Sequence, residues 1–138
     1  MAIQVGPHSV EIDGDIITVR LRGNFKLEHM KQWCTIADRV IAERGGAFTI
    51  SDFSAGGDFP PESRRYGSEW PNSGKVWGSV LVGSSLALRV LMTMIIRVSA
   101  MIRKDRGVPL VSVATEADAH AWVSEQRSKL GLPQAPRT

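Results

Sequence analysis

Polar residues follow two predicted strands at the points where these strands end, in segments 52–57 and 83–85. In an open α/β sheet such segments lie at one edge, and ligands bind in the crevice outside that edge. Free backbone N–H groups and serine hydroxyls at the start of a helix, as in segment 83–85, can bind an anion. We favour a simple cap at 83–85, because a phosphate-binding loop normally has more glycine and a lysine. The anion or ligand crevice would use Asp52, Ser54, Gly83, Ser84 and Ser85.

The other reactive residue types form no catalytic or metal-ligating pattern. His8, His29 and His120 are far apart in the sequence, and none has the spacing of a metal ligand or a catalytic base. Cys34 falls on the apolar face of a predicted helix, so we expect it to pack in the core. Paired carboxylates and a nucleophile elbow are also missing. We therefore expect no enzyme, metal or cofactor, and an enzymatic alternative would rest on the crevice alone.

Length and composition indicate one globular domain. A chain of 138 residues with 43% hydrophobic and 22% charged residues can bury a core without a disulfide or a metal. The net charge is +3, and the basic cluster at Arg97, Arg103, Lys104 and Arg106 complements the end of a predicted helix. It lacks interleaved aromatics, so we expect no nucleic-acid partner. The start of the chain has no signal-peptide pattern, which favours a cytoplasmic protein.

Segment 76–103 is the most apolar continuous stretch and predicts a strand, a break and a helix. Arg89 and Arg97 lie within it and would be costly at the centre of a bilayer, so we expect no membrane span. With Thr93 and Lys104 they form one polar stripe, and apolar residues fill most of the remaining circumference. One sheet face cannot cover so wide an arc, so another helix, a second subunit or a hydrophobic ligand must do so. The candidate interface residues are Met92, Met94, Ile95 and Met101.

Hydrophobic periodicity along the chain predicts strands that alternate with helices. The Asp13-Gly14 pair suits a tight hairpin turn, and the later alternation is typical of a largely parallel sheet. We expect an α/β domain over 1–131, with an N-terminal hairpin, a mixed five-stranded sheet and about four helices, and a flexible tail over 132–138. The expected elements are strands 10–12 and 15–21, helix 27–44, strand 47–53, helix 62–70, strand 76–82, helix 86–103, strand 110–114 and helix 116–130.

Capping residues predict where the helices begin and end. Asn24 suits the N-cap of the first helix, and Gly45 suits its C-terminal stop. Thr115 opens the last helix as part of a capping box with Asp118. The last helix is expected to bury one stripe, made of Ala119, Trp122, Val123, Gln126 and Leu130.

Four short stretches with this order of elements resemble the SpoIIAA-like domains of the STAS (anti-sigma-factor antagonist) family, in particular its STAS/SEC14-type branch. The stretches are 19–23, 51–54, 82–90 and 115–123. The resemblance implies a SpoIIAA-like fold in a bacterial regulatory protein. It also implies a protein partner that is similar to an anti-sigma factor or a kinase.

The resemblance further implies a phosphoacceptor serine at the start of the second helix. A phosphate there would end partner binding, because it brings nearly two negative charges to a packed surface. Ser63, followed by Arg64 and Arg65, is the nearest equivalent, although the Asp-Ser-Ser-Gly type stretch of the family is absent. Ser54 is the second candidate, although an Asp-x-Ser sequence at a strand end commonly forms a turn.

Two functions are compatible with these patterns. The first is a non-enzymatic regulatory domain that binds a protein partner through the loop and helix after residue 54, as a homodimer. The alternative is a carrier or sensor of a small, lipid-like apolar ligand held under the central helix 86–103. Segment 54–74, rich in glycine and proline, would gate that site or provide a crossover without a role.

Overall fold

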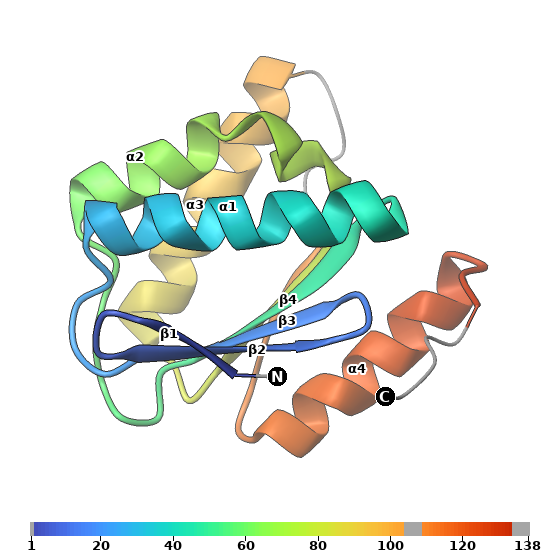
Figure 1. Cartoon of the computed structure of the whole chain (residues 1–138), viewed down its shortest axis with the longest axis horizontal. Coiled ribbons are helices and arrows are strands. Elements are labelled where there is room, and N and C mark those ends of the chain that lie inside the picture. The colour runs from blue at the N-terminus through green and yellow to red at the C-terminus, as the bar shows by residue number, and fades with distance from the viewer. Residues whose placement is uncertain (1, 104–108, 134–138) are drawn as a thin grey trace.

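The computed structural model describes residues 2–103 and 109–133. It is a mixed α/β structure with four α-helices, as expected (Figure 1). The elements are β1 (Ala2–Val5), β2 (His8–Asp13), β3 (Ile16–Arg20), α1 (Leu27–Arg44), β4 (Ala47–Asp52), α2 (Pro61–Glu69), the 3₁₀ helix η1 (Pro71–Lys75), β5 (Val76–Val82), α3 (Leu86–Arg103), β6 (Leu110–Val113) and α4 (Glu116–Lys129).

The sheet has six strands in the order β1-β2-β3-β4-β5-β6, which is also their order along the chain. The first three strands pair antiparallel, and β3 to β6 pair parallel. The prediction of five strands missed β1. This strand has only four residues, and Gly6, whose φ is +59°, turns the chain directly into β2. Four residues are too few to show a reliable period of two.

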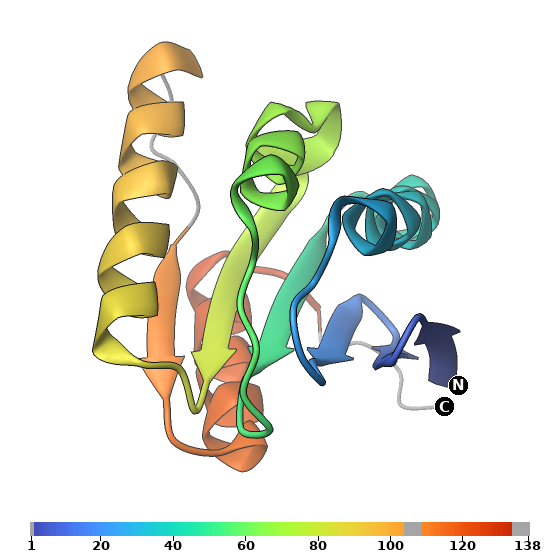
Figure 2. The same ribbon diagram turned by 90° about the vertical axis from the view of Figure 1, so that its left-hand side faces the viewer.

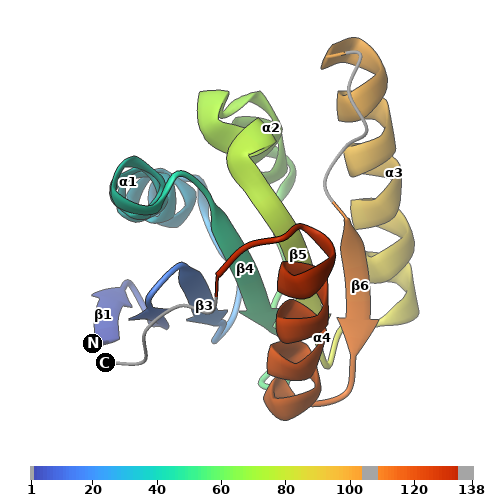
Figure 3. The ribbon, with the colours of Figure 1, turned by 90° about the vertical axis from the view of Figure 1, so that its right-hand side faces the viewer.

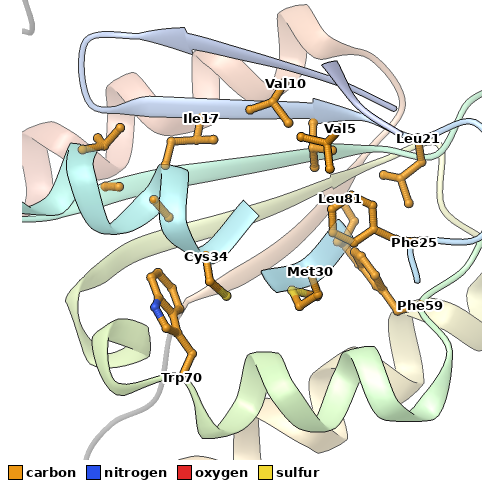
Figure 4. Packing of buried hydrophobic residues seen from close by; sticks show 14 of the residues in the cluster. Val5, Val10, Ile17, Leu21, Phe25, Met30, Cys34, Phe59, Trp70 and Leu81 are labelled. Carbon is orange, nitrogen blue, oxygen red and sulfur yellow. The ribbon is translucent and has the colours of Figure 1, made fainter. Parts of the chain in front are cut away.

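Helices cover the two faces of the sheet unequally. Helices α1, α2 and α3 lie on one face, the front face, and α4 lies on the opposite, back face (Figures 2 and 3). Front-face strand residues such as Ile17 and Leu81 form one buried cluster with residues of α1 and with the aromatic residues Phe25, Phe59 and Trp70 (Figure 4). The back-face core consists of Phe48, Ile50, Val80, Val82, Ala119 and Val123.

The first helix begins at the predicted residue, Leu27, but its N-cap differs from the prediction. Its N-cap is Lys26 and not Asn24, and the backbone N–H of Lys26 donates to Nδ1 of His29 (3.1 Å). The carbonyl oxygen of Asn24 instead pairs with Nε2 of the buried His8 (3.2 Å), so this residue belongs to the preceding loop. Gly45 ends the helix in the left-handed conformation, as predicted.

The last helix is capped as predicted but buries a different residue near its end. Thr115 Oγ1 accepts a hydrogen bond from the N–H of Asp118 (3.1 Å). Leu130, expected on the buried stripe, is 47% exposed, whereas Arg127 is buried. Leu132, at the start of the predicted tail, packs against the back-face core. Residues 134–138 of that tail lie outside the described residues.

Ion pairs fasten α4 to the sheet at both ends. Near its C-terminus, two guanidinium nitrogens of Arg127 donate to the two carboxylate oxygens of Asp15 (2.6 and 2.7 Å), and both side chains are almost fully buried. At its N-terminus, Glu116 accepts two hydrogen bonds from Arg20 of β3 (2.7 and 2.9 Å). Bidentate geometry of this kind fixes orientation as well as distance. The two pairs therefore set how α4 lies on the back face.

Arg127→Met is expected to lower the free energy of unfolding by about 3–5 kcal/mol, because it leaves the Asp15 carboxylate buried without its partner. Adding Asp15→Asn should recover part of this loss, since the remaining group is then neutral. Urea unfolding followed by circular dichroism measures both variants. Arg39→Met, at an exposed position of α1, is the matched control and should change stability by less than about 0.5 kcal/mol. An equally small effect for Arg127→Met would contradict this account of the pair.

Candidate functional site

The two strand-end segments of the predicted crevice lie side by side. The N–H of Phe53 donates to the carbonyl of Val82 (2.8 Å), and the N–H of Gly83 donates to that of Val113 (3.1 Å). Gly83 has a φ of +64°, and a Cβ there would lie 2.9 Å from Oγ of Ser54. Glycine therefore allows both the left-handed turn and the close approach of the two segments.

A groove of about 370 Å³ lies between these segments and the start of α3. The hydroxyl of Ser85 accepts a hydrogen bond from the N–H of Leu88 (3.2 Å), so it caps α3. The hydroxyl groups of Ser84 and Ser112 form a hydrogen bond with each other (2.9 Å). The lining includes the carboxylate residue Asp58 and, among the residues described, no basic side chain. This arrangement does not favour an anion.

Asp52 interacts with the Arg20–Glu116 ion pair at the start of α4. One of its carboxylate oxygens accepts a hydrogen bond from the N–H of Ser54 (2.8 Å). Burial acts to raise the pKa of Asp52, but hydrogen bonds with Glu116 and Ser54 and the charge of Arg20 outweigh burial and lower it. Asp52 therefore remains a carboxylate and has structural partners on two sides.

The two serines predicted as phosphoacceptors differ in access. Ser63, in the first turn of α2, is completely buried, and its hydroxyl has no hydrogen-bond partner within the described part of the chain. Ser54 is exposed in the loop after β4. A kinase could reach Ser54 in this conformation, whereas Ser63 would require α2 to move.

An exposed apolar stripe runs along α3. Its members follow one another at intervals of four, four, four and three residues, which places them on one side of the helix. Two predicted interface residues, Met94 (59% exposed) and Met101 (78% exposed), belong to it. A third, Met92, packs instead against the front-face core, and the side chain of Ile95 lies outside the described residues. The α3 stripe consists of Leu86, Val90, Met94, Val98 and Met101.

A second apolar feature, which sequence reasoning did not locate residue by residue, is a cavity under α2. It has a volume of about 170 Å³ and lies between the front face of the sheet and the helices α1, α2 and α3. Thr49, Ser51 and Ser79 form its floor on the central strands β4 and β5. Hydroxyl residues at alternate positions of a central strand are the sequence signal for it, because such positions normally carry large apolar side chains.

Two histidines that are far apart in the sequence lie next to each other in the structure. The rings of His8 and His29 lie 4.8 Å apart in an edge-to-face arrangement. Both Nδ1 atoms pair with the backbone, since Nδ1 of His8 accepts from the N–H of Arg22 (3.0 Å) and Nδ1 of His29 accepts from that of Lys26. The pair is therefore a structural element of the front-face core.

Cys34 is buried, in agreement with its predicted place in the core. Burial, together with the charge of Asp38, raises the pKa of the thiol to about 12. Within the described residues, no cluster of histidine, cysteine and acidic side chains could hold a metal ion. In the same part of the chain, no helix has the length and apolar character needed to cross a bilayer.

Neither a protein-family model nor a curated protein matches this sequence. Solved structures do match its fold, among them the following two. One is the anti-sigma factor antagonist SpoIIAA in its unphosphorylated form, with a TM-score of 0.57, 16% identity, and coverage of 85% of this chain and 97% of that one. The other is an uncharacterized DUF3478-family protein from Shewanella loihica, with a TM-score of 0.53, 14% identity, and coverage of 87% and 98%. The chain thus has the SpoIIAA-like fold expected from its sequence.

The free energy of unfolding is expected to fall as the pH drops below about 6.5. Burial lowers the pKa of His8 below its ordinary value of 6.5, the hydrogen bond with Asn24 partly opposes this, and His29 adds to it. The unfolded chain therefore binds the proton first, and stability present at neutral pH is lost between the unfolded and folded pKa values. His8→Gln should flatten this dependence in urea titrations between about pH 7 and pH 5. His120→Gln, at an exposed position, should leave it unchanged; a flat wild-type profile would refute the prediction.

Proposed function

We propose that this chain is a cytoplasmic regulatory module that binds a protein partner on the α3 stripe. The observation that carries the proposal is the stripe itself, five large apolar side chains that are 52–78% exposed on one side of one helix. An extended apolar face of this kind is the usual mark of an association surface. The likeness of the fold to an anti-sigma factor antagonist supports a regulatory role.

Charge indicates which partner fits the stripe. Arg89 and Arg97 are exposed on α3 beside the stripe, and the sequence of the helix contains no aspartate or glutamate. Two copies related by a two-fold axis through the stripe would bring arginines together without an acidic side chain from either helix. A homodimer through α3 is therefore disfavoured. An amphipathic helix whose apolar face is flanked by acidic residues would pair with both arginines.

A second function, the sensing of a small apolar ligand, is favoured by the cavity under α2. Segment 54–74 contains α2, so the helix that covers the cavity belongs to the segment expected to gate it. A ligand in the cavity would contact α1, α2 and α3 together. Occupancy could in this way alter the position of α3 and its affinity for a partner.

Two synthetic amphipathic peptides of about 18 residues test the first function. They share an apolar face and carry either glutamates or lysines beside it, and fluorescence anisotropy reports their binding. The acidic peptide should bind and the basic peptide should not. Met94→Glu should weaken binding by about tenfold or more, because it removes a buried apolar contact from the complex.

Gln32→Glu, at an exposed position of α1, carries the same change in charge and should leave acidic-peptide binding nearly unchanged. Equal binding of both peptides, or an equal effect of the two variants, would contradict a specific α3 site. Sedimentation equilibrium tests the homodimer. If the chain is a dimer that Met94→Glu converts to a monomer, a second copy covers the stripe and the proposed partner is wrong.

A further inference from the structure

The size of the cavity under α2 follows from small residues on its two opposing sides. The floor carries Thr49, Ser51 and Ser79, and the helix above contributes Gly67, which has no side chain. These residues lie near the centre of the front face, where larger side chains would meet. The resulting volume of about 170 Å³ is close to that of apolar cavities of about 150 Å³ that bind benzene. The fitting ligand therefore has about six to ten non-hydrogen atoms.

The walls determine the body of such a ligand. Most of the exposed surface inside the cavity is apolar, with side chains such as Phe25, Phe59, Leu81 and Met92. Arg64 is the charged residue in the described lining, and its Nη1 already donates to the carbonyl oxygen of Phe59 (2.8 Å). A ligand with an uncharged aromatic or compact aliphatic body would fill this space at the lowest cost in desolvation.

Unused donors determine its polar group. Trp33 lines the cavity, and its buried indole N–H has no hydrogen-bond partner within the part of the chain that the structure describes. The neighbouring indole of Trp70, whose ring lies 5.4 Å away, instead donates to Asp38 (2.8 Å). An indole nitrogen can only donate, and a buried donor without an acceptor costs about 1–3 kcal/mol. Trp33 is therefore a lining residue whose donor is unused.

The floor adds a second donor. Oγ1 of Thr49 and Oγ of Ser79 lie 2.7 Å apart and form a hydrogen bond with each other. Each hydroxyl has one proton, so their mutual bond uses one and leaves the other available. Residues that line the cavity thus carry an unused N–H donor and an unused O–H donor, while most of the exposed surface inside it is apolar.

We propose that the cavity binds a small uncharged molecule with an apolar body and one hydrogen-bond acceptor, and that the indole N–H of Trp33 donates to that acceptor. The proposal rests on the ligand-sensing function given above and specifies the chemistry of its ligand. It assigns Trp33 as the residue that distinguishes an acceptor-bearing ligand from a hydrocarbon of the same shape.

Acetophenone and α-methylstyrene test this assignment, because they share one shape and differ in a carbonyl oxygen against a methylene carbon. Both are titrated into the full chain by NMR. Acetophenone should bind about threefold or more tightly, in line with one net hydrogen bond, and should shift the Trp33 indole proton downfield. Without a donor the carbonyl would be penalised, and α-methylstyrene would bind more tightly.

Variants separate hydrogen bonding from shape. Trp33→Phe keeps an aromatic ring and should abolish the preference for acetophenone. Trp77→Phe makes the same change on the back face, beside Phe48, and should preserve the preference. Gly67→Leu should block both ligands by filling the cavity. If Trp33→Phe does not fold, the indole shift in the wild-type chain still decides the proposal.

The outcomes distinguish the assignment of Trp33 as the donor from the more general proposal that the cavity binds a ligand. Preference for acetophenone with a shifted Trp33 resonance supports the assignment. Equal binding, or preference for α-methylstyrene without that shift, overturns the acceptor chemistry and leaves ligand binding in place. Failure of both molecules to bind up to their solubility limits overturns the ligand-sensing function as well.

Discussion

The structure depends on a difference between the two faces of the central strands. On the back face, β4 and β5 present Phe48, Ile50, Val80 and Val82, all almost completely buried. On the front face the same strands present Thr49, Ser51 and Ser79 beside Leu81, so part of this face carries only small or hydroxyl side chains. One helix is sufficient to close the back face, whereas three helices share the front face and leave a cavity. The tightly packed back-face core and the cavity on the front face thus lie on opposite sides of the same two strands.

The position of α3 follows from the same arrangement. Helices α1 and α2 occupy the space above the middle of the sheet, so α3 lies at its margin beside β6 (Figure 2). There Leu88 and Met92 reach the core, and Met94 and the rest of the stripe have no sheet beneath them. The exposed α3 stripe and the cavity therefore have the same cause, which is that three helices share the front face of the sheet. This common origin gives a physical basis for coupling between a ligand and a partner.

The sequence predicted those elements whose hydrophobic period is long and uninterrupted. The bounds of β5 and α3 agree with the structure, because segment 76–103 contains a clear break between two strong patterns. Strand β1 was missed because it is short. Arg127 was missed for another reason: a charged residue reads as exposed unless its partner is known, and Asp15 is 112 positions away. For the cavity, periodicity shows which side chains face inward but does not show whether their volumes fill the space.

The order of the strands has a consequence for how the chain reaches this structure. Each strand pairs with its predecessor in the sequence, so the sheet can grow from one edge as the chain leaves the ribosome. The two antiparallel hairpin pairings require little loop closure and favour rapid formation, whereas each of the three parallel pairings closes a longer crossover that contains a helix. The contact between Asp15 and Arg127 is different, since it joins the second hairpin turn to the last helix. It can form only after nearly the whole chain has been synthesised, and it makes completion of the back face a late step.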